Sequence, residues 1–137
     1  MNRIALALIA AAALQVSAAE AREAHTLIGA WRGEYSYADD RAAVPLALTF
    51  SNVVGDKLVG RSSEPGCSTC QDTGPRTAAW RGYVVGDRLI INKIYDGSGD
   101  GAWAHVVEYE GVIAADGRSI AGTWRIGSVN GPFEVRR

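Results

Sequence analysis

Two cysteines separated by two residues, Cys67 and Cys70, are the first candidates for chemistry in this sequence. The spacing suits redox exchange, but a redox-active pair usually begins a helix after a parallel strand, and no such pattern surrounds this one. Residue 71 is Gln, where attachment of a c-type haem would need His. With only two His in the chain, zinc binding is not expected either. We therefore predict a disulfide between Cys67 and Cys70, provided that the chain is exported.

The acidic and imidazole side chains do not predict catalysis or metal binding. Residues 96–101 copy the first half of a calcium loop, but the twelfth position is Val107, where a bidentate acid is needed. His105 has no nucleophile in a triad order. Glu108 and Glu110 share a strand face about 7 Å apart, a spacing that suits acid and base work, although outer-face charges are far commoner. We expect no enzymatic activity, no metal and no cofactor.

One lysine and several aromatic residues form the pattern that is most informative about function. Lys93 falls on the apolar face of its predicted strand, together with Leu89 and Ile91. A buried charge needs a partner, which a ligand acid or a tyrosine hydroxyl can supply. Tyr37 ends the first predicted strand, Tyr95 ends the fifth and Trp103 begins the sixth, so all three are expected at one rim. The predicted ligand-binding residues are Tyr37, Lys93, Tyr95, Trp103 and His105.

These residues lie in a chain that alternates apolar and polar side chains from residue 28 onward, the period of half-buried β-strands. Gly86-Asp87 and Asp116-Gly117 are typical of tight hairpin turns. No segment has a sustained helical period. The alternation predicts strands over 29–37, 45–53, 57–63, 77–85, 88–95, 103–114, 119–126 and 132–137.

Eight successive antiparallel strands without crossover helices predict an all-β fold, an up-and-down barrel that leaves no exposed edge. A two-sheet β-sandwich is the alternative. In a barrel the longer connections, residues 38–44, 64–76, 96–102 and 127–131, would gather at one rim. Eight strands enclose a space that side chains fill or that holds one small ligand. The sequence therefore predicts a cup with its mouth at the rim of long connections.

The first 19 residues are predicted to be a signal peptide. Arg3 precedes an apolar run from Ile4 to Leu14, and small residues follow it. Cleavage after Ala19 or Ala21 fits these small residues. The run is too short to span a membrane, so no transmembrane segment is expected in the mature form. We predict a periplasmic or secreted protein, with a short lead over 20–27 and a single barrel domain over 28–137.

Charge and composition exclude one class of partner. The chain has 14 basic and 15 acidic residues, a formal net charge of -1. Proteins that bind nucleic acid usually carry a basic surplus for the phosphate backbone. Hydrophobic residues make up 47% of the chain, enough for a folded core. Nucleic acid is therefore not an expected partner.

Several short features resemble the calycin group, the lipocalin-like and avidin-like barrels. They are Gly29-x-Trp31 at the start of the first strand, the meander of hairpins, Trp124 in the seventh strand and Arg136-Arg137 at the end. In lipocalins the Gly-x-Trp tryptophan closes the barrel floor, and a late arginine packs across it. The resemblance implies floor residues Trp31, Trp124 and Arg136, with Arg137 as the alternative arginine. No helix follows the last strand as in lipocalins, and biotin is not implied.

Two functions fit this fold. The first is an exported carrier or sensor that holds a small apolar or amphipathic molecule in the barrel mouth. The second is a protein-interaction or inhibitor module that docks an envelope protein through its long loops. A carrier needs a mouth lined by residues such as Tyr37, Lys93 and Trp103, whereas an interaction module would fill the interior and expose anchors on its loops.

Overall fold

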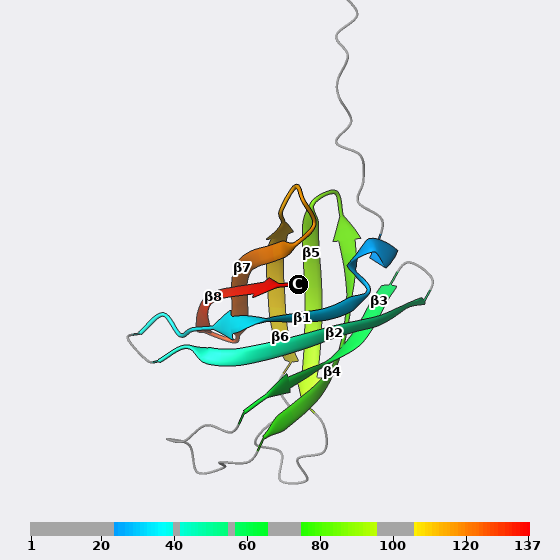
Figure 1. The fold of residues 1–137 in the computed structure, drawn as a ribbon. Helices are drawn as coiled ribbons and strands as arrows, with labels where there is room; N and C mark the ends of the chain where they lie inside the picture. The colour runs from blue at the N-terminus through cyan, green and yellow to red at the C-terminus, as the bar shows by residue number, and fades with distance from the viewer. Residues whose placement is uncertain (1–23, 40–41, 55–56, 66–74, 96–105) are drawn as a thin grey trace, which may run out of the picture.

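A computed structural model describes residues 24–39, 42–54, 57–65, 75–95 and 106–137 (Figure 1). The described residues form one short 3-10 helix and eight β-strands. Their bounds are η1 (Ala24–Leu27), β1 (Gly29–Tyr35), β2 (Val44–Val54), β3 (Lys57–Glu64), β4 (Arg76–Val85), β5 (Arg88–Tyr95), β6 (Val106–Ile113), β7 (Ser119–Ile126) and β8 (Val129–Arg136).

The strands close into a barrel in which each strand pairs with the next in the order β1 to β8. The barrel closes where β8 pairs antiparallel with β1, through registers such as Arg32 opposite Arg136 and Tyr35 opposite Phe133. This confirms the predicted all-β, eight-stranded up-and-down barrel, and the alternative β-sandwich is wrong. Closure pairs the backbone of both terminal strands, which an open sheet would leave as edges.

The connection between β7 and β8 is shorter than predicted. β7 ends at Ile126 and β8 begins at Val129, so the long connection expected over 127–131 is wrong. Gly127 has a φ of 55°, which allows a tight turn that a residue with a side chain rarely adopts. The sequence predicted a loop at Val129 and Asn130. Both residues are exposed in the structure, but their backbones pair with β7 in the sheet.

One end of the barrel, called here the closed end, is sealed by Trp31. The Trp31 indole is fully buried, and its Nε1 donates a hydrogen bond to the Leu27 carbonyl of η1 at 2.9 Å. The guanidinium of Arg137 lies 4.8 Å from the centre of the Trp31 ring, a cation–π distance, and donates to the Thr26 carbonyl at 2.8 Å. Arg137 is therefore the arginine that packs across Trp31.

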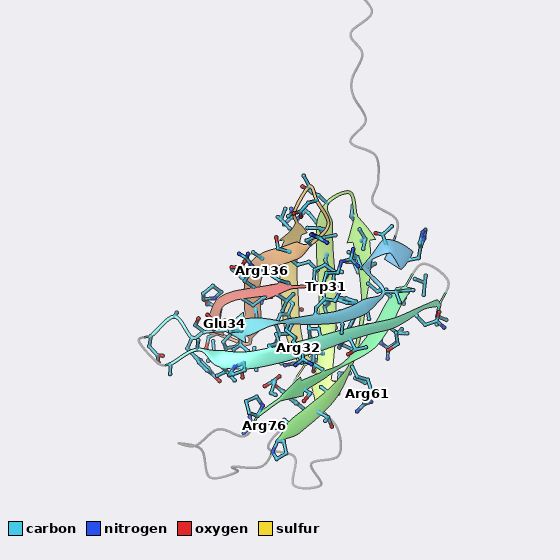
Figure 2. All side chains as sticks on the ribbon, in the orientation of Figure 1. Trp31, Arg32, Glu34, Arg61, Arg76 and Arg136 are labelled. Atoms are coloured by element: carbon cyan, nitrogen blue, oxygen red, sulfur yellow. The ribbon has the colours of Figure 1, made fainter. Side chains whose placement is uncertain are left out.

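Arg136, the arginine selected for the floor, lies on the outside of the barrel (Figure 2). Its guanidinium pairs with Glu134 two residues earlier. The physical reason is strand alternation: Val135 is fully buried, so its neighbour Arg136 must point outward. Arg137 follows the last strand and folds back over the closed end instead.

Much of the predicted N-terminus lies outside the described residues. This includes the predicted signal peptide over 1–19, both candidate cleavage sites and residues 20–23 of the lead. The rest of the lead is η1, whose Leu27 is buried in the core. Among the residues that the structure describes, we find no helix with the length and hydropathy of a membrane span.

Candidate functional site

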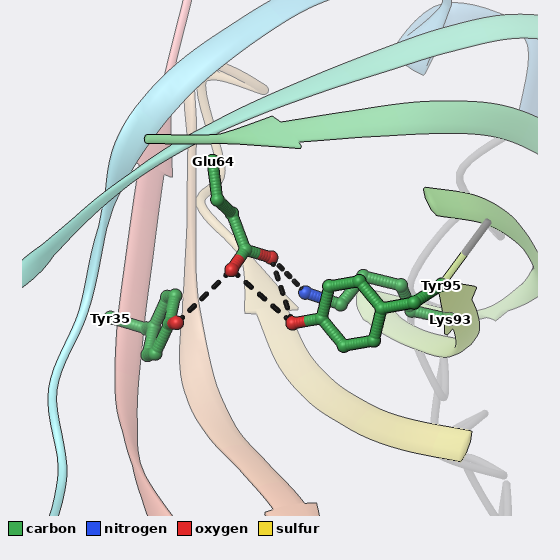
Figure 3. Close-up of polar contacts among 4 residues, drawn as sticks. All are labelled: Tyr35, Glu64, Lys93 and Tyr95. Carbon is green, nitrogen blue, oxygen red and sulfur yellow. Dashed lines mark hydrogen bonds and ion pairs between the residues drawn. The ribbon is translucent and has the colours of Figure 1, made fainter. Parts of the chain in front are cut away.

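A charged pair lies inside the barrel, near the end opposite Trp31. Glu64 is the last residue of β3, Lys93 is in β5, and their side chains are 2% and 1% exposed. The Lys93 ammonium contacts the Glu64 carboxylate directly (Figure 3). We call this end, where β1, β3, β5 and β7 finish, the mouth end. The pair is thus a complete ion pair removed from water at the mouth end.

Two tyrosine hydroxyls donate to the same carboxylate. Tyr35, the last residue of β1, donates to Glu64 Oε2 at 3.1 Å. Tyr95, the last residue of β5, donates to Oε1 at 3.1 Å and to Oε2 at 3.2 Å (Figure 3). With the Lys93 ammonium, three side chains from two strands donate to one carboxylate. Such hydrogen bonds offset part of the cost of burying its charge.

Aromatic rings surround the ammonium of Lys93. Its Nζ lies 4.6 Å from the ring centre of Tyr95, 5.2 Å from that of Tyr109 and 5.9 Å from that of Tyr35. These distances permit cation–π attraction, which strengthens when the groups are shielded from water. We call Tyr35, Glu64, Lys93, Tyr95 and Tyr109 the mouth cluster.

Strand alternation and antiparallel register place this cluster. Glu64 follows Leu58 and Ser62 on the inward face of β3, and Lys93 follows Leu89 and Ile91 on the inward face of β5. Odd-numbered strands finish at the mouth end, so their last inward residues meet there even though Glu64 and Lys93 are 29 residues apart. The ends of β1, β3 and β5 thus build one site.

Burial shifts the acid–base properties of the cluster. Removal from water lowers the pKa of Lys93 below its ordinary value, although the Glu64 carboxylate opposes the shift. Burial, followed by the charge of Glu64, raises the pKa of Tyr35, Tyr95 and Tyr109 well above the ordinary value. The three hydroxyls therefore stay protonated well above the pH at which an exposed tyrosine ionises.

Trp124 also lies at the mouth end, not in the floor where the resemblance placed it. Its Nε1 donates to the Ser36 carbonyl at 2.8 Å, just beyond the end of β1. Its ring centre is 5.5 Å from that of Tyr35 and 5.0 Å from that of Tyr37. Trp124 is near the end of β7, which runs toward the mouth, whereas Trp31 is near the start of β1. The two tryptophans therefore lie at opposite ends of the barrel.

The structure brings together some of the residues selected from the sequence. Lys93 and Tyr95 are in the mouth cluster, and Tyr37 packs beside it against Tyr35 and Trp124. The other predicted binding residues and the predicted disulfide lie outside the described residues: Trp103, His105, Cys67 and Cys70.

Glu64, the centre of the cluster, was not among the site residues predicted from the sequence. It was assigned to the connection over 64–76, because the predicted third strand ended at residue 63. The signal that could have found it is the alternation of inward Leu58 and Ser62, which continues to residue 64. The partner of Lys93 is therefore supplied by the chain itself.

The carboxylates on the outer face of β6 have a different role. Glu108 pairs with Arg125, and Glu110 pairs with Arg88. All four side chains are more than half exposed. These cross-strand pairs are typical of a solvated sheet surface.

Comparison with known proteins identifies the fold and no family. No protein-family model matches the chain, and no curated protein matches it. A solved structure, EF1p2_mFAP2b bound to DFHBI, is similar to the chain with a TM-score of 0.65. The match covers 85% of this chain and 97% of the other, with 13% sequence identity. At this identity the similarity shows a shared barrel fold only.

Proposed function

We propose that this protein is an exported carrier or sensor that binds a small apolar or amphipathic molecule at the mouth of its barrel. The observation that carries the proposal is the buried Glu64–Lys93 pair with two tyrosine hydroxyls on the same carboxylate. Closing a barrel needs only apolar side chains at these positions. Replacing buried ion pairs by apolar residues is often neutral or stabilising, so stability alone is a poor reason to keep this one.

The position of the cluster supports a binding role. Tyr95 is only partly buried and stands at the very end of β5. Its hydroxyl can redirect its hydrogen bond from Glu64 to a polar group of a ligand. Next to it, the half-buried ring of Tyr37, which packs against the buried Trp124, offers aromatic surface for the apolar part of the same molecule. This combination of apolar walls and few polar groups is typical of small-molecule sites.

Two further observations support the proposal. The N-terminal pattern of Arg3, the apolar run and the small residues around Ala19 favours export to a periplasmic or extracellular location. The barrel of similar fold, EF1p2_mFAP2b, has a bound small molecule, DFHBI. Because Glu108 and Glu110 are in outer-face ion pairs, we propose binding and not catalysis as the activity.

Native mass spectrometry of the protein recovered from the cells that make it tests this function. We expect an added mass that disappears under denaturing conditions and that identifies the ligand by its mass. Tyr95→Phe should weaken rebinding about threefold to tenfold through one lost hydrogen bond. Tyr83→Phe on the outer face is the matched control and should bind as the original protein does.

Two results would contradict the proposal. One is a protein without any dissociable small molecule, which would favour the protein-interaction or inhibitor module. The other is a ligand whose affinity is the same in Tyr95→Phe, Trp103→Ala and the control, which would move the site away from the mouth.

A further inference from the structure

A groove of about 510 Å³ lies on the outer face of β2, β3, β4 and β5, away from the mouth cluster. Its walls include Val59 and Arg61 of β3, Arg81 of β4 and Ile94 of β5. Ala79 of β4 lies between them. Arg61 projects from the outer side of the barrel in Figure 2. The volume is in the range of small-molecule pockets.

Register and side-chain size explain the hollow. One cross-strand row holds Arg61, Ala79 and Ile94, so a methyl group lies between two long side chains. The residue before Arg61 is Gly60, where a Cβ would lie 1.9 Å from the Thr49 carbonyl oxygen and 2.5 Å from the Trp80 ring. Gly60 therefore has to remain small. The groove is built by strands, which hold its walls in fixed positions.

The charged side chains that line the groove are basic. Among the residues that line it, Lys57, Arg61 and Arg81 are basic, and none is acidic. Arg81 is opposite Val59, two residues from Arg61 on the same face of β3. Diagonal neighbours of this kind are about 7–8 Å apart at their Cα atoms. Two guanidinium groups at this spacing can donate to the same carboxylate or phosphate.

Apolar surface lies beside these cations. Ile94 is 45% exposed although it is a large aliphatic residue. Val59 and Ala79 extend the apolar strip between the arginines. A ligand that fits both features has an apolar body and an anionic head.

We propose that this groove is a second binding site, which takes a free amphipathic molecule with a carboxylate or phosphate head. The head binds Arg61 and Arg81, and the apolar body lies over Ala79 against Val59 and Ile94. The barrel wall separates the groove from the mouth cluster, so the two sites bind separately. This site stands on its own observations and holds whether or not the mouth binds a ligand.

Calorimetric titration with decanoate and decyl phosphate below their micelle concentrations tests the proposal, with decanol as the neutral probe. We expect both anions to bind more tightly than decanol, and added salt to weaken them. Arg61→Gln and Arg81→Gln should each weaken decanoate about tenfold. Arg125→Gln, which removes the same charge from β7, should leave the affinity unchanged.

Filling the groove is the steric test. Ala79→Trp should abolish decanoate binding while circular dichroism stays that of a folded barrel. If that variant does not fold, the charge variants and the comparison with decanol still test the proposal.

The proposal would be overturned if decanol and decanoate bound equally, or if Arg125→Gln lost affinity. It would also be overturned if Tyr95→Phe lost affinity while Arg81→Gln did not. Binding only to vesicles that contain phosphatidylglycerol, with no binding of the free anions, would also overturn it. That result would identify a membrane headgroup as the source of the anion.

Discussion

Replacing Glu64 by glutamine should destabilise the barrel strongly, because it leaves the Lys93 ammonium buried without its counter-charge. Lys93 is 1% exposed, and its ion-pair partner is Glu64. Removing one member of a buried pair typically costs about 3–5 kcal/mol of unfolding free energy. Tyr35 and Tyr95 can still donate to the amide oxygen of glutamine, so the main loss is the charge.

The protonation of Lys93 sets an upper limit on this cost. The buried amine can lose its proton instead of remaining charged, and its ordinary pKa is 10.5. Removing this proton costs about 1.4 kcal/mol for each pH unit below the ordinary pKa. The destabilisation is therefore limited to about 5 kcal/mol at pH 7 and about 2 kcal/mol at pH 9. The destabilisation by Glu64→Gln should therefore shrink as the pH rises toward 10.

Urea unfolding followed by tryptophan fluorescence measures this effect at the two pH values. Glu108→Gln is the matched control, because Glu108 is 51% exposed in its pair with Arg125, and it should change stability by less than about 1 kcal/mol. The double variant Glu64→Leu with Lys93→Met should recover most of the stability that Glu64→Gln loses. A cost below about 1 kcal/mol at pH 7, or a cost that does not depend on pH, would refute the reasoning.

Three other features can be tested in the same way: the buried tyrosines, the close backbone contact at Gly33 and the arginine over Trp31. Above pH 10 the unfolding free energy should fall by about 4 kcal/mol per pH unit, because Tyr35, Tyr95 and Tyr109 have a raised pKa in the fold and ionise first in the unfolded chain. The near-ultraviolet absorbance of these three phenolates should therefore rise only on unfolding, and a gradual titration of the folded protein would contradict this. Gly33→Ala places a Cβ 1.8 Å from the Glu134 carbonyl oxygen, so denaturant melts should show a loss above about 3 kcal/mol, and an unchanged midpoint would exclude the close contact. Arg137→Ala removes the contact with Trp31 and should cost about 1 kcal/mol, with faster hydrogen exchange of the η1 amides; Arg136→Ala is its control.

The fold was predictable because its signals are local. Alternation from residue 28 onward and glycine at the turns identify eight strands, and β5 and β7 have the predicted bounds. The errors occurred where polar or small residues take part in pairing. Val129 and Asn130 resemble a loop in composition, yet their backbones complete the β7–β8 ladder.

The candidate site was predictable in part. Alternation placed Lys93 inside the barrel and required a partner for it, but it did not identify Glu64. Trp124 and Arg136 show a second limit. The resemblance placed Trp124 in the barrel floor, but the height of this residue along the barrel depends on strand direction and register. Arg136 and Arg137 are adjacent, and only the path of the chain after β8 decides which one reaches Trp31.

The sequence by itself determined the class of fold, the two-residue alternation of its strands, and the place of Lys93 on an inward face. These properties follow from the two-residue period of a strand and from turn residues, which act over a few positions. Only the tertiary structure decided that Glu64, Tyr35 and Tyr95 meet Lys93, and that Arg61 and Arg81 flank Ala79. Barrel closure and strand register determine these contacts, because they set which residues of separate strands lie at the same height along the barrel.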